Sequence, residues 1–256
     1  MASPLPVMHA TDDPFTATHW SVIEAAGRGD TEPQRARLAL AELCRIYWAP
    51  LYSFVRSRGY SVHDAQDLTQ SFFAHLIERE IYTKADPQKG RFRTFLLASL
   101  KNFLADSYSY AQRQKRGGGQ EFVALDDNCA EAAEALFQTQ MPAAGSICDE
   151  LVFERSWAET LVGTSMKRLA AEYEAEGKRA LFLQLKVFLT GGEEPMPSYD
   201  ELAEKLSMPA STLRSHVTRL RARYRELLRS EVRQTVSSDS EVDAELREMF
   251  RILVAA

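Results

Sequence analysis

The sequence has little cysteine and no pattern typical of a metal or catalytic site. Its three cysteines, Cys44, Cys129 and Cys148, lie far apart and form no CxxC pair. This spacing argues against a zinc site and a disulfide framework and suits a reducing cytoplasm. The five histidines show no HExxH-type spacing, and no P-loop, GxSxG or GxGxxG motif is present. The sequence therefore predicts a protein that is not an enzyme, with no catalytic residues, no metal and no cofactor.

Long hydrophobic runs are missing as well. No segment approaches the roughly 20 apolar residues that a membrane-crossing helix needs, and residues 1 to 14 lack the basic and apolar stretches of a signal peptide. These absences predict a cytoplasmic protein without a membrane partner. Alternation of apolar and polar residues, the pattern of β-strands, extends over no useful length, so the sequence favours an all-α fold.

Charge is unevenly distributed along the chain, although its formal net value is only -5. Residues 91 to 116 contain six basic residues and one acidic residue, whereas residues 121 to 159 contain nine acidic residues and one basic residue. Residues 209 to 233 contain seven arginines and two glutamates. Each basic segment can neutralise phosphates locally while the net charge stays negative. Charge runs are usually solvated helix faces, but both basic segments coincide with patterns suited to DNA, which favours a nucleic-acid ligand.

Apolar residues recur at three- and four-residue steps through most of the chain, which is the period of amphipathic helices. The predicted helices comprise residues 20 to 26, 34 to 58, 63 to 80, 91 to 116, 131 to 140, 151 to 176 and 179 to 189, followed by the two helices of residues 198 to 229. Pro50 should kink the helix of residues 34 to 58 or divide it into two, and Gly59 should end it. The three glycines 117 to 119 should begin an acidic, alanine-rich linker.

Residues 198 to 229 have the layout of a helix-turn-helix. Ser198 and Glu201 form a capping-box pattern at the start of a short first helix, and residues 207 to 209 predict the turn, since proline can begin a helix without losing a hydrogen bond. The apolar stripe of the second helix comprises Leu213, Val217, Leu220, Tyr224 and Leu227. Its polar face carries Ser211, Arg214, Ser215, Thr218 and Arg219, side chains of the kind that bind base edges and phosphates in a major groove. An ordinary helical hairpin with an arginine-rich exposed face is the alternative.

The helix of residues 63 to 80 has two different predicted faces. One side carries Ala65, Leu68, Phe72 and Leu76, and the other carries Asp64, Asp67, Gln70 and Ser71. The acidic, amide-bearing face suits docking on a basic protein surface, with a plain amphipathic core helix as the alternative. Residues 90 to 116 then interleave aromatic and basic side chains, which can bind unstacked bases and phosphates, although Phe95 and Phe103 are expected in the core.

Together these segments resemble a known family. The succession DAQDLTQSFF, FRTFLLASLKNFLAD and YDELAEKLSMPASTLRSHVTRLRARYRELL is similar to bacterial RNA polymerase sigma factors of the extracytoplasmic-function (ECF) class, over roughly residues 34 to 116 and 155 to 232. The resemblance implies two small helical domains, a sigma region 2-like bundle and a region 4-like helix-turn-helix, joined by an acidic linker and followed by a C-terminal helix. The implied division is an N-terminal extension (1–33), the region 2-like domain (34–116), the linker (117–154), the region 4-like domain (155–232) and an amphipathic tail (233–256).

The resemblance further implies a sigma factor that binds core RNA polymerase, helps to melt the minus-ten element and reads the minus-thirty-five element. The implied polymerase-binding residues, which would dock on the beta-prime clamp helices, are Asp64, Asp67, Gln70 and Ser71. The implied DNA-binding residues of the first domain are Lys89, Arg91, Arg93, Asn102, Arg113, Lys115 and Arg116. Those of the second domain are Ser211, Arg214, Ser215, Thr218 and Arg219.

The implied partners are promoter DNA and core polymerase, including its beta flap, with an anti-sigma factor or a regulatory kinase as a further partner. Thr69, on the polymerase-facing helix, is the residue that such a kinase would modify. Acidic residues in the linker should weaken DNA binding by the free protein. The alternative function is a polymerase-independent helix-turn-helix regulator, in which residues 34 to 116 serve dimerisation or sensing.

Residues 239 to 254 predict a final amphipathic helix. Val242, Leu246, Phe250 and Leu253 fall on one stripe. This helix either packs on the second DNA-binding domain or masks a polymerase-binding or DNA-binding surface.

Overall fold

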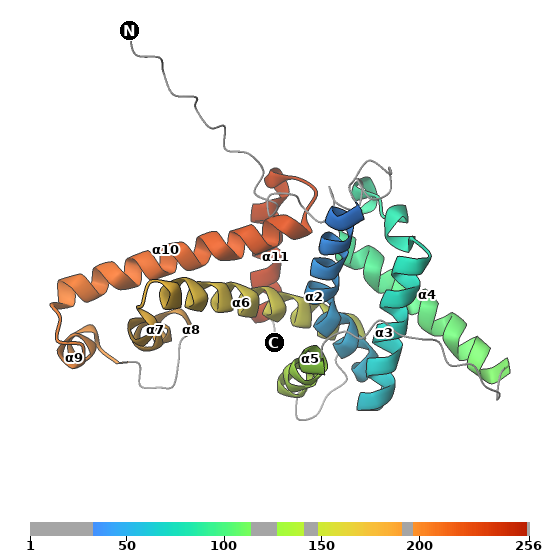
Figure 1. Ribbon diagram of the computed structural model, residues 1–256, viewed down its shortest axis with the longest axis horizontal. Helices are drawn as coiled ribbons and strands as arrows, with labels where there is room; N and C mark the ends of the chain where they lie inside the picture. The colour runs from blue at the N-terminus through green and yellow to red at the C-terminus, as the bar shows by residue number, and fades with distance from the viewer. Residues whose placement is uncertain (1–32, 114–126, 141–147, 191–196, 255–256) are drawn as a thin grey trace, which may run out of the picture.

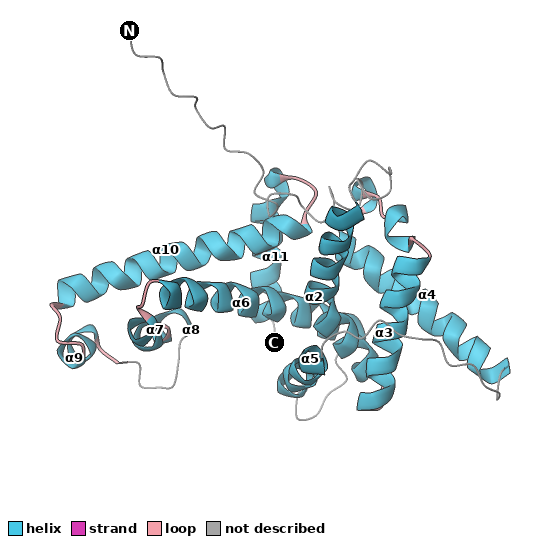
Figure 2. Ribbon diagram, viewed as in Figure 1, coloured by secondary structure: helices cyan, strands magenta, loops and turns pink. Residues whose placement is uncertain are grey.

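The computed structural model describes residues 33–113, 127–140, 148–190 and 197–254. Within these ranges the chain consists of helices joined by turns, and no strand is present (Figure 2). The prediction of an all-α fold is confirmed, whereas the division into two domains and a linker stays a prediction. The predicted helix of residues 20 to 26 and the glycines 117 to 119 lie outside the described residues. None of the described helices is long and apolar enough to cross a membrane.

The first described helix, α2 (Pro33–Ser57), is uninterrupted, so the prediction that Pro50 divides it is wrong. Pro50 lacks the amide hydrogen that would bond to the carbonyl of Ile46, a loss that often breaks a helix. Here Pro50 and the aromatic and aliphatic side chains around it are buried, and this packing offsets the lost hydrogen bond so that the helix continues to Ser57. Gly59, with a φ of 87°, follows the helix end as predicted.

The helix α3 (Val62–Glu78) begins at its N-cap Ser61, whose hydroxyl oxygen accepts a hydrogen bond from the Asp64 amide at 3.1 Å. After this helix the chain forms two short 3-10 turns, η1 (Ile81–Lys84) and η2 (Pro87–Lys89). Gly90 then leads into α4 (Phe92–Arg113) with a φ of 134°, a backbone conformation that side chains disfavour.

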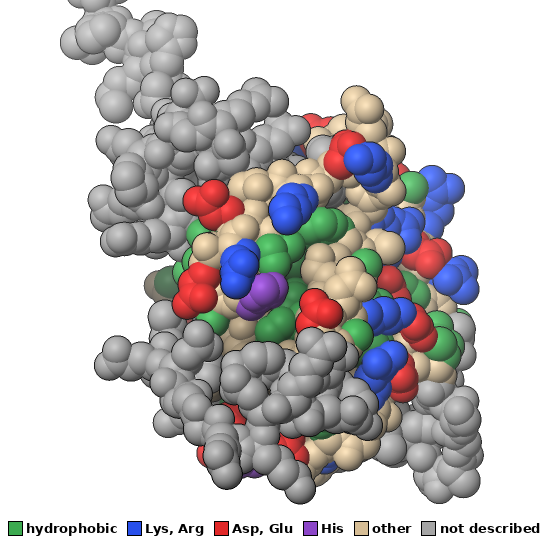
Figure 3. Space-filling model, turned by 90° about the vertical axis from the view of Figure 1, so that its right-hand side faces the viewer, with side chains coloured by type: hydrophobic (Ala, Val, Ile, Leu, Met, Phe, Trp, Pro, Cys, Tyr) green, Lys and Arg blue, Asp and Glu red, His purple; other side chains and the backbone are tan. Residues whose placement is uncertain are grey.

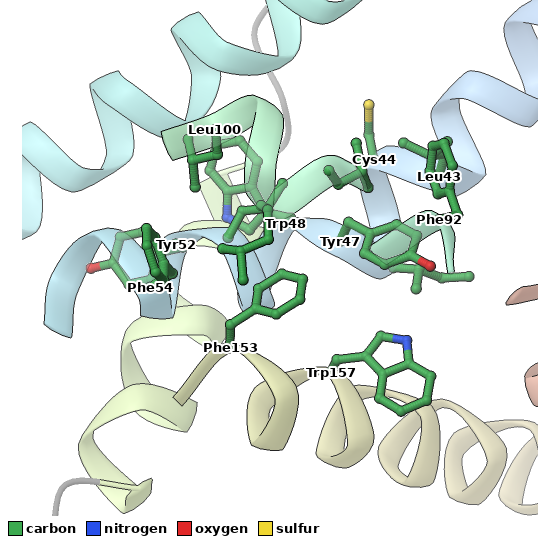
Figure 4. Packing of buried hydrophobic residues seen from close by; sticks show 14 of the residues in the cluster. Leu43, Cys44, Tyr47, Trp48, Tyr52, Phe54, Phe92, Leu100, Phe153 and Trp157 are labelled. Carbon is green, nitrogen blue, oxygen red and sulfur yellow. The ribbon is translucent and has the colours of Figure 1, made fainter. Parts of the chain in front are cut away.

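The larger hydrophobic core, which we call core 1, is built around α2. Side chains of α2 pack against α3, α4 and the long helix α6 (Asp149–Ala175). Figure 4 shows Phe153 and Trp157 projecting from α6 beneath Trp48 and Tyr47 of α2. All four side chains are at most 3% exposed, so α6 is held firmly against the first half of the chain.

The helix α5 (Asp127–Gln140) lies within the segment predicted as a linker and extends the short helix expected there. It packs on α2 and buries Ala133 and Phe137 in core 1. Glu134 accepts hydrogen bonds from Tyr52 at 2.5 Å and from Arg56 at 2.9 and 3.0 Å. The acidic segment is therefore docked on α2 at this point.

A second core, core 2, lies between the far end of α6 and the first half of α10 (Ala210–Thr235). It is completed by α7 (Arg179–Leu185), α8 (Val187–Thr190) and α9 (Tyr199–Lys205), so the predicted helix of residues 179 to 189 is two short helices. The two long helices α6 and α10 run side by side along the molecule (Figure 1). Each contributes buried side chains to both cores.

The last described helix, α11 (Val242–Val254), follows the short turn η3 (Asp239–Glu241) and packs on α6 and α10. Its buried side chains are Val242, Glu245, Met249 and Ile252. Of the predicted stripe, Val242 is buried and Leu246 and Leu253 pack partly buried against core 1, whereas Phe250 is 51% exposed, so the prediction is wrong for Phe250. The helix is rotated so that Glu245, rather than Phe250, faces inward.

Candidate nucleic-acid interface

The turn between α9 and α10 is fixed by local hydrogen bonds. The Ser198 hydroxyl oxygen accepts from the Glu201 amide at 3.2 Å, and the Glu201 carboxylate accepts from the Ser198 amide at 2.9 Å, which confirms the predicted capping box. Ser207 then adopts a φ of 50°, and the Met208 amide donates to the Ala203 carbonyl at 3.0 Å. These bonds set the direction in which α10 leaves the turn.

The first half of α10 presents opposite faces to core 2 and to solvent. Its side chains Leu213, Val217, Leu220 and Leu227 are buried against α7, α8 and α9, and Tyr224 is half-buried. The predicted apolar stripe is confirmed. The predicted polar residues are all exposed; they are Ser211, Arg214, Ser215, Thr218 and Arg219. We call the surface formed by these five residues the reading face.

Contacts along the reading face hold its side chains close to the helix. Ser215 and Thr218 donate to the carbonyls one turn earlier at 3.0 and 2.9 Å, which leaves their oxygens able to accept. The guanidinium of Arg214 lies 5.7 Å from the ring centre of Tyr199, within the range of a cation–π contact. Tyr199 in turn stacks on Phe188 at 4.8 Å. The reading face is therefore partly ordered by its own neighbours.

The charge of the reading face is not neutralised by nearby carboxylates. Among the described residues, none lies within ion-pair distance of Arg214, Arg219 or Arg225, whereas Arg223 is paired with Glu172 at 2.7 Å. Such a face is electrostatically suited to phosphate.

One further cation was missed by sequence reasoning. Burial lowers the pKa of His216, and the positive charges of Arg219 and Lys178 lower it further. Lys178 thus acts on His216 from 38 residues away in sequence, and its ammonium is itself paired with the Glu176 carboxylate at 2.7 Å. No local motif could have indicated it, because the fold alone brings these residues together.

The basic residues at the start of α4 have a different environment. Arg93 is buried, with its Nε 2.6 Å from the Glu154 carboxylate and its Nη1 bonded to Glu245 of α11. Its guanidinium also lies 4.0 Å from the ring centre of Trp157. Burial lowers the pKa of Arg93, and Glu154 opposes that shift. Arg91 is half-exposed and its Nε lies 2.9 Å from the second oxygen of Glu245.

The other DNA-binding residues predicted for the first domain are dispersed. Lys89 is exposed in η2 and lies 3.4 Å from Asp86, and Asn102 is exposed on α4. The side chain of Arg113, and Lys115 and Arg116 entirely, lie outside the described residues. Their roles stay predictions.

The predicted polymerase-binding residues lie on one side of α3. Asp64 and Asp67 are exposed, and Gln70 and Ser71 are half-buried. Figure 3 looks onto the end of the molecule formed by α3 and α4, where charged side chains of both signs surround exposed hydrophobic surface. Apolar surface surrounded by charged side chains of both signs is suited to a protein partner.

The hypothesis that a kinase modifies Thr69 is not compatible with this structure. Thr69 is fully buried, and its hydroxyl donates to the Ala65 carbonyl at 2.7 Å. A phosphate at this position would have to displace the packing between α3 and α2. The buried side of α3 otherwise agrees with the prediction, since Ala65, Phe72 and Leu76 all face core 1.

The comparisons with known proteins add no relative. No protein-family model, curated protein or solved structure matches the chain. The residues described here also contain no cluster of histidine, cysteine, aspartate and glutamate able to hold a metal ion.

Proposed function

We propose that the chain is a sigma factor of the ECF class, which binds core RNA polymerase and directs it to promoters. The observation that carries the proposal is the reading face of α10, an exposed, hydroxyl- and arginine-bearing surface fixed by a capped helix-turn-helix. In this function α10 reads the minus-thirty-five element from the major groove. Arg214 and Arg219 bind guanine edges or phosphates, and Ser211, Ser215 and Thr218 bind bases or backbone.

Docking on polymerase is assigned to the exposed side of α3. Asp64, Asp67, Gln70 and Ser71 bind the beta-prime clamp helices, and the second half of the chain binds the beta flap. The support is the exposure of both aspartates on a helix whose opposite side is anchored in core 1. Such anchoring keeps the acidic side chains in a fixed arrangement for a basic partner surface.

Recognition of the minus-ten element is assigned to η2 and α4. Lys89 and Asn102 are exposed there and can contact a strand whose bases leave the duplex. Opening the duplex needs no bond chemistry, because capture of unstacked bases and polymerase contacts supply the free energy.

One observation favours a second candidate, a polymerase-independent regulator. Among the described residues, nothing covers the reading face, so the free chain could bind duplex DNA. The two functions differ in what polymerase adds: a sigma factor needs it for promoter-specific initiation, whereas an independent regulator binds its sites equally well alone.

The deciding experiment is run-off transcription with core polymerase over a promoter library, alongside binding of the free chain to the same DNA. Wild-type chain should give discrete transcripts, and the double charge reversal Asp64→Lys with Asp67→Lys should abolish them. Glu131→Lys, an exposed reversal on α5, is the matched control and should initiate normally. Failure to associate with polymerase, or full initiation by the double variant, would refute the proposed function.

A further inference from the structure

The buried row of α11 contains a carboxylate where an apolar side chain would be expected. Val242, Met249 and Ile252 of this row contact core 1, yet Glu245 between them is only 2% exposed. A buried carboxylate is strongly unfavourable unless it is paired. Its position therefore indicates a specific partner.

The partner is the start of α4. Both oxygens of Glu245 are used, one by Arg93 and the other by Arg91 at 2.9 Å. Arg93 is shared with Glu154 of α6. We call Arg91 and Arg93 together the α4 basic end. The two positive charges of the α4 basic end are balanced by two glutamates, Glu154 of α6 and Glu245 of α11.

One donor of this cluster is not satisfied by α11. The Nη2 of Arg93 is buried and has no hydrogen-bond partner among the described atoms. A guanidinium in a dry site normally bonds through all its accessible N–H groups. The α4 basic end can therefore accept one more anionic oxygen than Glu245 and Glu154 supply.

We infer that the α4 basic end binds two alternative ligands, α11 through Glu245 in the free chain and a nucleic-acid phosphate when α11 is displaced. This inference rests on the proposed function, because it assigns the second ligand to promoter DNA. A phosphodiester carries the same single negative charge as the Glu245 carboxylate, so the exchange leaves the cluster balanced. It also offers Arg93 Nη2 the acceptor that it lacks.

The geometry limits what the exchange releases. Arg93 stays bound to Glu154 and stacked on Trp157, both on α6, so only its Nη edge becomes available. Arg91, already half-exposed, becomes fully available. The contact of α11 with α10 through Asp243 and Arg229 is an exposed pair on a different surface, which makes Asp243 a suitable control position.

The first test compares binding of the free full-length variants Glu245→Gln and Asp243→Asn to a labelled random-sequence duplex. Glu245→Gln should bind about fivefold or more tightly than wild type. The slope of log affinity against log salt should steepen by roughly 0.9 for each additional phosphate contact. Asp243→Asn should match wild type in both measurements. A Glu245→Gln protein with normal far-ultraviolet circular dichroism, wild-type affinity and wild-type slope would overturn the inference.

The second test uses wild-type chain and does not depend on how a variant folds. Amide hydrogen exchange of residues 242 to 254 is measured for the free chain and for the chain with core polymerase and duplex DNA that supports initiation. These amides should lose protection in the complex, and unchanged protection would overturn the inference. If wild-type chain neither associates with polymerase nor initiates, the proposed function fails instead. A retained gain of DNA affinity in Glu245→Gln would then still support competition by α11.

Discussion

The two basic segments of the chain both carry an excess of positive charge, but the arginines at their starts have opposite surroundings. At the start of α4, Arg91 and Arg93 are paired with carboxylates from α6 and α11. At the start of α10, Arg214 and Arg219 project into solvent with no described carboxylate in ion-pair distance. Positive charge in a sequence thus does not indicate which segment is available to a ligand. In this conformation, the start of α10 carries the arginines that stay open to solvent.

The acidic segment between them accounts for much of this difference. Its glutamates pair with basic side chains of α2 and α4: Glu134 with Arg56, Glu150 with Lys101, and Glu154 with Arg93. These glutamates therefore neutralise basic side chains in the first half of the chain, including two of the first basic segment. In the second segment Arg214 and Arg219 have no such partner among the described residues, whereas Arg223, Arg229 and Arg233 are paired with other carboxylates. An acidic chain can therefore still present a cationic face at the start of α10.

The largest effect on stability is expected from removing Glu245, the α11 partner of the α4 basic end. Replacing Glu245 with alanine leaves two arginines short of a carboxylate in a buried site, and should lower the free energy of unfolding by about 3–5 kcal/mol. Urea denaturation followed by circular dichroism measures it. Asp243→Asn, which breaks an exposed pair of the same helix, should leave the midpoint nearly unchanged. Equal midpoints for both variants would contradict the buried pairing.

Acid should weaken a second contact, the ion pair between Arg56 and Glu134. Hydrogen bonds from Arg56 hold the pKa of Glu134 below its ordinary value of 4.5, at about 2. A depressed pKa stabilises the fold above pH 4.5, and that contribution is lost as the pH falls from 4.5 towards 2. Glu134→Gln should therefore cost about 1.5–3 kcal/mol at neutral pH and progressively less below pH 4.5. Thermal melts across this range test it, and a cost that does not change with pH would be contrary to expectation.

Substitutions in the reading face should change DNA binding and leave the stability of the fold unchanged. Arg214→Ala and Arg219→Ala should each weaken binding to the preferred promoter sequence by about 1–3 kcal/mol while leaving the unfolding midpoint in place. Titration of labelled promoter DNA with holoenzyme measures the effect. Arg223→Ala is the matched control, because Arg223 is engaged by Glu172 and Glu226. If Arg223→Ala weakened binding as much as the other two, the assignment of the reading face would be wrong.

The smallest effect should come from the N-cap of α9, the helix that precedes the turn into α10. Ser198→Ala removes the N-cap of α9 and should lower stability by about 1 kcal/mol, and Ser198→Asp should restore it. Chemical denaturation of the two variants provides the measurement. A loss that aspartate fails to rescue would mean that the capping hydrogen bonds are not its cause.

Features that depend only on interactions between residues near one another in sequence could be predicted. The capping box at Ser198 and the stripe from Leu213 to Leu227 were predicted correctly, because neighbouring residues alone decide them. The continuity of α2 through Pro50 was not, since it depends on packing from other helices.

Long-range pairing explains the remaining differences. Phe250 is the more hydrophobic side chain, yet Glu245 is buried in its place because it pairs with Arg91 and with Arg93, which is 152 residues earlier in the chain. Likewise, the positive charge of Lys178 lowers the pKa of His216 only because the fold brings together residues that are far apart in sequence. A periodicity analysis treats each segment alone and has no access to such partners.

The helix α6 belongs to both cores, with Leu161 buried in one and Leu169 in the other. Each residue advances a helix by about 100°. Inserting one residue near Gly163 would therefore rotate every later side chain of α6 away from its packed position in core 2. Natural variation in length should consequently be confined to the loops, where it leaves the rotational phase between the two ends of the molecule untouched.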